Sequence, residues 1–160
     1  MSKKLHNAVG MVNRFNIKHG VTIKNQGLQL GSEYSELRVA LDKGDFEPIR
    51  EEVGDVMFVS VSVGLLAGQT DFGVIESDNF DVFADNSVEL CSHIGSVQDE
   101  ILKDNHNAVK DHVNLALGIC SGICTYYHTD AVEALHDVAD ENLDKDASTE
   151  GGKVTKEGLE

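Results

Sequence analysis

The chain of 160 residues is 41% hydrophobic, which is enough for one compact domain with a substantial core. Its 28 acidic residues outnumber the 13 basic ones, and the net charge of −15 argues against non-specific nucleic-acid binding and against contact with an anionic membrane surface, since both need a cationic footprint. No apolar run reaches the roughly 18 residues of a membrane span. The first ten residues lack a signal-peptide core and three cysteines form no disulfide framework, so we expect a cytoplasmic protein with reduced thiols.

A single proline, no tryptophan and long stretches of helical periodicity predict an all-α fold, a helical bundle in one domain over residues 1–160. The expected helices, in chain order, span residues 3–19, 28–43, 46–67, 87–103, 107–127 and 130–143. We interpret residues 21–27 as a connection and residues 69–86 as an ordered connection with room for a short helix. Residues 144–160 lack an apolar period and are expected to be loop or extended chain.

The second and third expected helices are joined by a very short link. Gly44 follows the second helix as a stop signal, Asp45 is a suitable N-cap for the third, and Pro48 is tolerated in its first turn. Helices connected so closely must run antiparallel. We therefore expect a central helix hairpin.

Four carboxylates occur as two short pairs, one on each helix of this hairpin. Glu33 and Glu36 are three residues apart, as are Glu52 and Asp55, so each pair shares one helix face. Both faces continue in apolar residues, which places the carboxylates on core-side stripes. The stripe residues are Leu30, Leu37 and Ala40 beside the first pair, and Val56, Val59, Ser62 and Val63 beside the second.

Burying several like charges together costs several kcal/mol per ion unless a positive charge lies among them. Oxygen-only ligands favour a hard divalent cation, so we expect Mg²⁺, with Mn²⁺ as a substitute. The alternative without a metal is that both pairs are exposed helix carboxylates in surface ion pairs, which are common in proteins. Two pairs on facing core-side stripes favour the metal site.

Two weaker patterns lie in the second half of the chain. Residues 55–71 and 114–130 align without gaps, both as an apolar helix ending in Thr-Asp, which suggests a degenerate internal repeat without a second acidic pair. Cys120, Cys124 and His128 follow one another at spacings of four. Cysteine inside an apolar helix is more often a small buried hydrophobe than a zinc ligand, and we expect that here.

The arrangement of Glu33, Glu36, Glu52 and Asp55 resembles the all-α nucleoside triphosphate pyrophosphohydrolases, which include MazG-like proteins, phosphoribosyl-ATP pyrophosphohydrolases and dimeric dUTPases. Two further stretches carry the resemblance. Residues 12–20 are similar to the opening of many phage and bacterial members, and residues 142–145 with 152–156 are similar to the tail of the same group. On this view residues 1–68 carry the metal-binding helices, 87–143 form a second helical half, and 144–160 are a substrate-contacting or mobile tail.

The resemblance implies hydrolysis between the α and β phosphates of a (deoxy)nucleoside triphosphate, giving the monophosphate and pyrophosphate, with clearance of nucleotide pools as the expected role. It implies that the four carboxylates are the catalytic and metal-binding residues, with one of them as the base that orients water, and that the protein is a homo-oligomer, a dimer or a dimer of dimers. It also assigns substrate contacts to four tail positions, which are Asn142, Lys145, Lys153 and Lys156.

Alternatives stay open at this point. Phosphoribosyl-ATP is a compatible substrate. Ser32 stands where relatives often carry a further glutamate, and Glu141 and Asp144 add negative charge beside the tail positions where relatives have serine. These departures favour a second class of function, a catalytically weak helical protein that binds a nucleotide. A purely structural bundle is the third interpretation.

Overall fold

The computed structural model describes residues 1–77, 87–144, 148–150 and 153–155, with side chains up to residue 144. The elements are α1 (Lys3–His19), α2 (Ile23–Lys43), α3 (Phe46–Leu66), the 3-10 helix η1 (Gly73–Glu76), α4 (Ser87–Leu102), α5 (His106–Tyr126), α6 (Ala131–Asp144), β1 (Ser148–Glu150) and β2 (Lys153–Thr155). The predicted all-α class is therefore confirmed. The strands form one small antiparallel ladder in the tail expected to be extended, with Thr149 opposite Val154.

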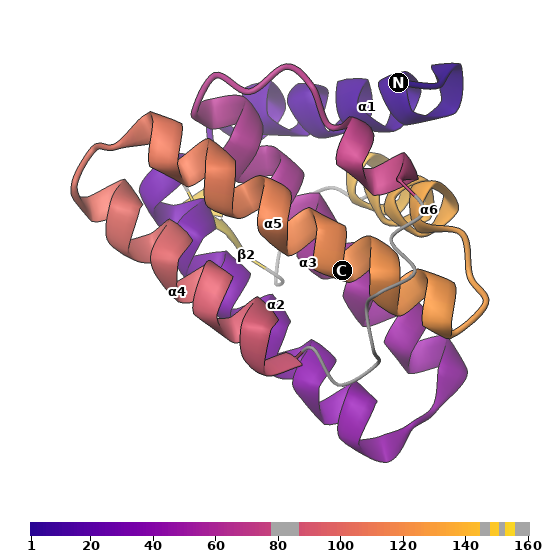
Figure 1. Cartoon of the computed structure of the whole chain (residues 1–160). Coiled ribbons are helices and arrows are strands. Elements are labelled where there is room, and N and C mark those ends of the chain that lie inside the picture. Colours follow the sequence, from indigo (N-terminus) through magenta and orange to yellow (C-terminus); the bar gives the residue numbers. More distant parts are fainter. Residues whose placement is uncertain (78–86, 145–147, 151–152, 156–160) are drawn as a thin grey trace.

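The bundle is built around α3 (Figure 1), which packs against α2, α5, α6 and α1. Its residues from Val56 to Gly64 are all buried, as expected for a helix that is apolar on every side. α4 packs against α2 and α5, and α1 packs against α6, so these helices enclose the central one. The stripe predicted for the first helix is buried as well, including Leu5, Val12 and Asn16.

The predicted start of the second helix at residue 28 is wrong, and the predicted connection over residues 21–27 is mostly helical. α2 begins at Ile23 because the Thr22 side chain accepts a hydrogen bond from the Asn25 amide, 3.2 Å long, and so caps the first turn. Gly27 packs tightly, since a Cβ there would lie 2.7 Å from Ile101 of α4. Tertiary contacts with α4 thus extend the helix by more than a turn beyond its apolar period.

The link between α2 and α3 is as short as predicted. Gly44 ends α2 in the left-handed conformation, with φ of 72°, where glycine carries no steric penalty. Asp45 occupies the N-cap position of α3, but its side chain makes no capping hydrogen bond, which corrects the capping role that we expected for it. The chain therefore reverses within two residues, and α2 and α3 pack along each other.

Gly54 lets α3 approach α6 closely. A Cβ at this position would lie 2.8 Å from Val138 Cγ2 and 2.9 Å from the backbone oxygen of Ala134. The backbone oxygen cannot move aside without shifting α6, so no side chain fits. Gly54 thus sets the distance between the two helices, in the turn of α3 that also carries Glu52 and Asp55.

We expect Gly54→Ala to destabilise the protein by about 1–3 kcal/mol because overpacking outweighs the helix propensity that alanine gains. Gly95 in α4 is the matched control, since a Cβ added there would meet nothing within 4 Å. Gly95→Ala should instead stabilise the protein by about 0.5–1 kcal/mol. Urea denaturation followed by circular dichroism measures both changes. Equal effects of the two substitutions would contradict the proposed close approach.

Cys120 and Cys124 are buried in α5, and burial raises the pKa of both thiols. Both therefore stay protonated and act as small hydrophobes, as predicted. α3 and α5 each span 21 residues, but the internal repeat stays a prediction. Between them, η1 supplies the short helix expected in residues 69–86, of which residues 78–86 lie outside the described part.

Candidate metal centre

The four predicted carboxylates come together between α2 and α3. Glu33, Glu36, Glu52 and Asp55 each offer one oxygen, and these oxygens all lie within 4.8 Å of one another. Glu33 acts most strongly among neighbouring charges on Asp55, and Glu36 acts most strongly on Glu52. Glu33 thus lies opposite Asp55, and Glu36 lies opposite Glu52, as expected when the two helices run antiparallel. The hairpin therefore forms two layers of opposed carboxylates, an inner layer of Glu33 and Asp55 and an outer layer of Glu36 and Glu52.

The two layers differ in how they meet solvent. Glu33 is buried, with 7% of its surface exposed, while Asp55 and Glu52 are half-buried. Burial raises the pKa of Asp55 to about 8, and the charges of Glu33 and then Glu52 add to this shift. Burial also raises the pKa of Glu52 to about 7, with the charge of Glu36 as the second cause. Full ionisation near neutral pH is therefore unfavourable without a compensating positive charge.

A divalent cation fits these residues. The donors are carboxylate oxygens alone, which suits Mg²⁺ or Mn²⁺. In addition, Oε2 of Glu52 is buried and accepts no hydrogen bond from the described residues. A buried carboxylate oxygen without a donor is costly, and an ion among the four groups would satisfy it. Within the described residues, this is the one group of histidine, cysteine or acidic side chains that could hold a metal ion.

Gln29 orients the most buried carboxylate, a contact that our sequence analysis missed. Its side-chain nitrogen donates a hydrogen bond of 2.7 Å to Oε1 of Glu33, one helical turn further along α2. This bond favours the ionised carboxylate and limits its rotamers. The spacing of four residues from the first glutamate is the signal that identifies such a partner in a sequence.

We expect Gln29→Met to weaken Mn²⁺ binding by about tenfold, because loss of an outer hydrogen-bond partner typically costs about 10–100-fold in metal affinity. Calorimetric titration with Mn²⁺ measures the effect. Leu28→Met is the control, since Leu28 is exposed and lies outside the site. If Gln29→Met binds Mn²⁺ as tightly as the wild type does, the orienting role is wrong.

A buried polar network secures the same helices beyond the inner carboxylate layer. The Gln26 amide donates to the Ser62 hydroxyl at 2.9 Å, and this hydroxyl donates to Oδ1 of Asn16 at 2.6 Å. The Asn16 amide in turn donates to the Ser62 backbone oxygen at 3.2 Å. These bonds join α1, α2 and α3, and they satisfy the side chain of Ser62, which the sequence placed on the carboxylate stripe. The network fixes the register of the hairpin.

Of the four tail residues predicted to contact substrate, only Asn142 has its side chain in the described part of the chain. Asn142 lies in the last turn of α6, where its side-chain amide donates to the Val138 oxygen of its own helix at 2.9 Å. Lys153 lies in β2, and its side chain is outside the described part of the chain, as are Lys145 and Lys156 entirely. Their proposed contacts with substrate stay a prediction.

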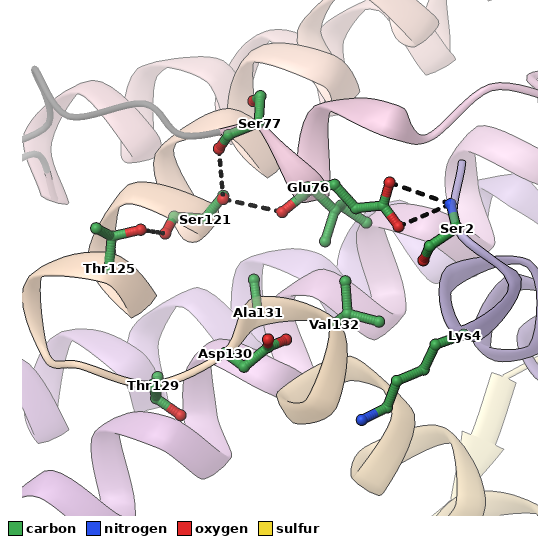
Figure 2. A pocket seen from close by; sticks show the side chains of 11 residues that line it. Ser2, Lys4, Glu76, Ser77, Ser121, Thr125, Thr129, Asp130, Ala131 and Val132 are labelled. Carbon is green, nitrogen blue, oxygen red and sulfur yellow. Dashed lines mark hydrogen bonds between the residues drawn. The ribbon is translucent and has the colours of Figure 1, made fainter.

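A separate cavity of about 360 Å³ lies between the start of α6, η1 and α5 (Figure 2). Its polar side chains already form hydrogen bonds, either with one another or with neighbouring residues such as Arg50 and Glu133. The Ser121 hydroxyl donates to the Ile75 backbone oxygen at 3.0 Å, the Ser2 amide donates to the Glu76 carboxylate at 2.9 Å, and Lys4 pairs with Glu133 at 2.8 Å. The contacts around this cavity attach η1 and the N-terminus to the bundle. The group of four carboxylates is therefore the stronger candidate for function.

Comparison with known proteins adds no assignment: no family model, no curated protein and no solved structure matches the chain. Among the described residues, none of the helices combines the length and apolar character needed to cross a membrane. Function is therefore inferred from the geometry of the site and from the sequence motifs.

Proposed function

We propose that this protein is a Mg²⁺-dependent nucleotide pyrophosphohydrolase, which cleaves a (deoxy)nucleoside triphosphate between its α and β phosphates and releases the monophosphate and pyrophosphate. The observation that carries the proposal is the group of four carboxylates, whose oxygens lie within 4.8 Å of one another across the hairpin. The resemblance of the motifs to all-α pyrophosphohydrolases supplies the reaction. Clearance of surplus or non-standard nucleotides is the role that we propose.

The four carboxylates would hold the cation from two sides. When bound, Mg²⁺ supplies positive charge for the phosphate oxygens and makes a bound water more acidic. Glu33, held by Gln29, would be a fixed ligand, and Glu52 and Asp55 would lose their protons when the cation binds. One of the four carboxylates would then orient the attacking water and accept its proton. We also propose that the protein is a homo-oligomer, a dimer or a dimer of dimers. Light scattering, which measures the molar mass in solution, tests this part of the proposal.

The direct test is pyrophosphate release from a panel of nucleoside triphosphates and phosphoribosyl-ATP, each with Mg²⁺ or Mn²⁺. We expect Glu36→Gln and Asp55→Asn to abolish release while the helical circular dichroism persists. Asp111→Asn, an exposed change of the same charge on α5, should retain wild-type turnover. If both site variants keep wild-type turnover, the assignment of these carboxylates is wrong.

Ser32 favours a second candidate, a protein that binds a nucleotide but turns it over poorly. This residue is exposed on α2, next to Glu33, and it offers no carboxylate to a further ion. Nucleotide binding in the presence of Mn²⁺, without pyrophosphate release from any member of the panel, is the result expected of this candidate. Ser32→Glu should then raise release if the missing carboxylate is the cause.

A further inference from the structure

We infer that the cavity at the outer end of the carboxylate group binds the base and sugar of the substrate, so that the protein prefers nucleotides over inorganic polyphosphates. This inference rests on the proposed function. The cavity has a volume of about 470 Å³ and lies against α2 and the first turns of α3. Its lining residues are Ser35, Glu36, Val39, Ala40, Lys43, Asp45, Pro48 and Glu52.

The cavity is continuous with the candidate metal centre, because Glu36 and Glu52 belong to both. These two form the outer layer of the carboxylate group. The inner layer of Glu33 and Asp55 is followed by buried residues of the hairpin, including Leu30 with no exposed surface. A ligand held at the carboxylates therefore extends outward, toward the link between α2 and α3.

The walls of the cavity are chemically unlike the metal centre. Val39, Ala40 and Pro48 give it apolar surface, and 54% of Val39 is exposed in the structure. A base gains from covering such surface, since each base has an apolar face. A polyphosphate gains nothing from apolar walls, and it would also meet the negative charge of Asp45. Lys43 offers an amino group to the edge of a base or to a sugar hydroxyl, and the Ser35 hydroxyl, which donates to the Gly31 backbone oxygen at 3.1 Å, can still accept a hydrogen bond.

The test compares two ligands in calorimetric titrations of the full chain with Mn²⁺: a deoxynucleoside triphosphate (dATP, dCTP, dGTP or dTTP in turn) and inorganic tripolyphosphate. Val39→Trp fills the cavity from an exposed position without changing any carboxylate. We expect it to weaken nucleotide binding by about tenfold, the loss of one stacked base, and to leave tripolyphosphate binding within about twofold. Leu28→Trp, on the same helix but outside the cavity, should change neither.

Four results would overturn the inference. If the wild type binds tripolyphosphate as tightly as it binds every nucleotide, the cavity does not contribute to binding, although the phosphate site stands. If Val39→Trp weakens the binding of nucleotide and tripolyphosphate equally, the base lies elsewhere. The same conclusion follows if this substitution leaves nucleotide binding unchanged. A wild-type protein that binds Mn²⁺ but neither ligand would overturn the proposed function and, with it, this subsite.

Discussion

Asp55→Asn is expected to raise the melting temperature of the metal-free protein at pH 8 by about 10 °C, which corresponds to a stabilisation on the order of 3 kcal/mol. The reason is the raised pKa of Asp55, about 8 in the folded protein against 3.8 for a free side chain. At pH 8 the unfolded chain ionises this group freely, whereas the folded protein must either keep a proton or bury a charge beside Glu33. Asparagine has nearly the same shape and carries no charge.

The sign of the pH dependence follows from the same shift. Between about pH 4 and pH 8 the folded protein binds more protons at Asp55 and Glu52 than the unfolded chain does, so the stability of the metal-free wild type falls as the pH rises. Thermal denaturation at pH 5 and pH 8 measures this fall, and Asp55→Asn should reduce it. Asp111→Asn tests whether a lower net charge alone is sufficient. Equal stabilisation by the two variants at pH 8 would contradict the destabilisation that we assign to the buried charge of Asp55.

Mn²⁺ at 100 times its dissociation constant is expected to raise the melting temperature of the wild type at pH 8 by about 8 °C, because ligand binding at that excess stabilises a folded protein by about 2.7 kcal/mol. At pH 5 the shift should be nearly absent, since Glu52 and Asp55, with pKa values of about 7 and 8, then hold protons that the cation must displace. Differential scanning fluorimetry at the two pH values measures both shifts.

Asp55→Asn is also the control for this second experiment, because it removes one ligand and leaves the helices in place. We expect Mn²⁺ to have little effect on its melting temperature at pH 8. A shift of the same size at pH 5 and pH 8, or one retained by Asp55→Asn, would mean that the ion binds elsewhere on this acidic protein.

The carboxylate site could be predicted from the sequence because its information is local. The two carboxylate pairs have helical spacing and lie next to apolar stripes, one pair on each side of the short link. These features determine which side chains meet when the two helices pack antiparallel. The start of α2 could not be predicted in the same way. Gln26 and Gly27 are polar or small, and their burial depends on Ser62 and Ile101, which are distant in the sequence.

Other features of the site also depend on tertiary structure. The cavity beside Glu36 exists because Val39 on α2 and Pro48 on α3 face the same space, which requires the register of the hairpin as well as its helices. The raised pKa of Asp55 requires the depth at which it is buried. By contrast, the expected capping role of Asp45 was wrong because N-cap preference does not guarantee the hydrogen bond.

The close packing of Gly54 against Ala134 links the position of α6 to the geometry of the candidate site. The backbone of α6 packs against the turn that carries Glu52 and Asp55, two of the four candidate ligands, so a displacement of α6 should shift both of them. Substitutions in α6, which carries none of the four carboxylates, should therefore adjust the ion affinity of the candidate site in small steps. A directed-evolution library confined to that helix would sample this adjustment while every coordinating side chain stays the same.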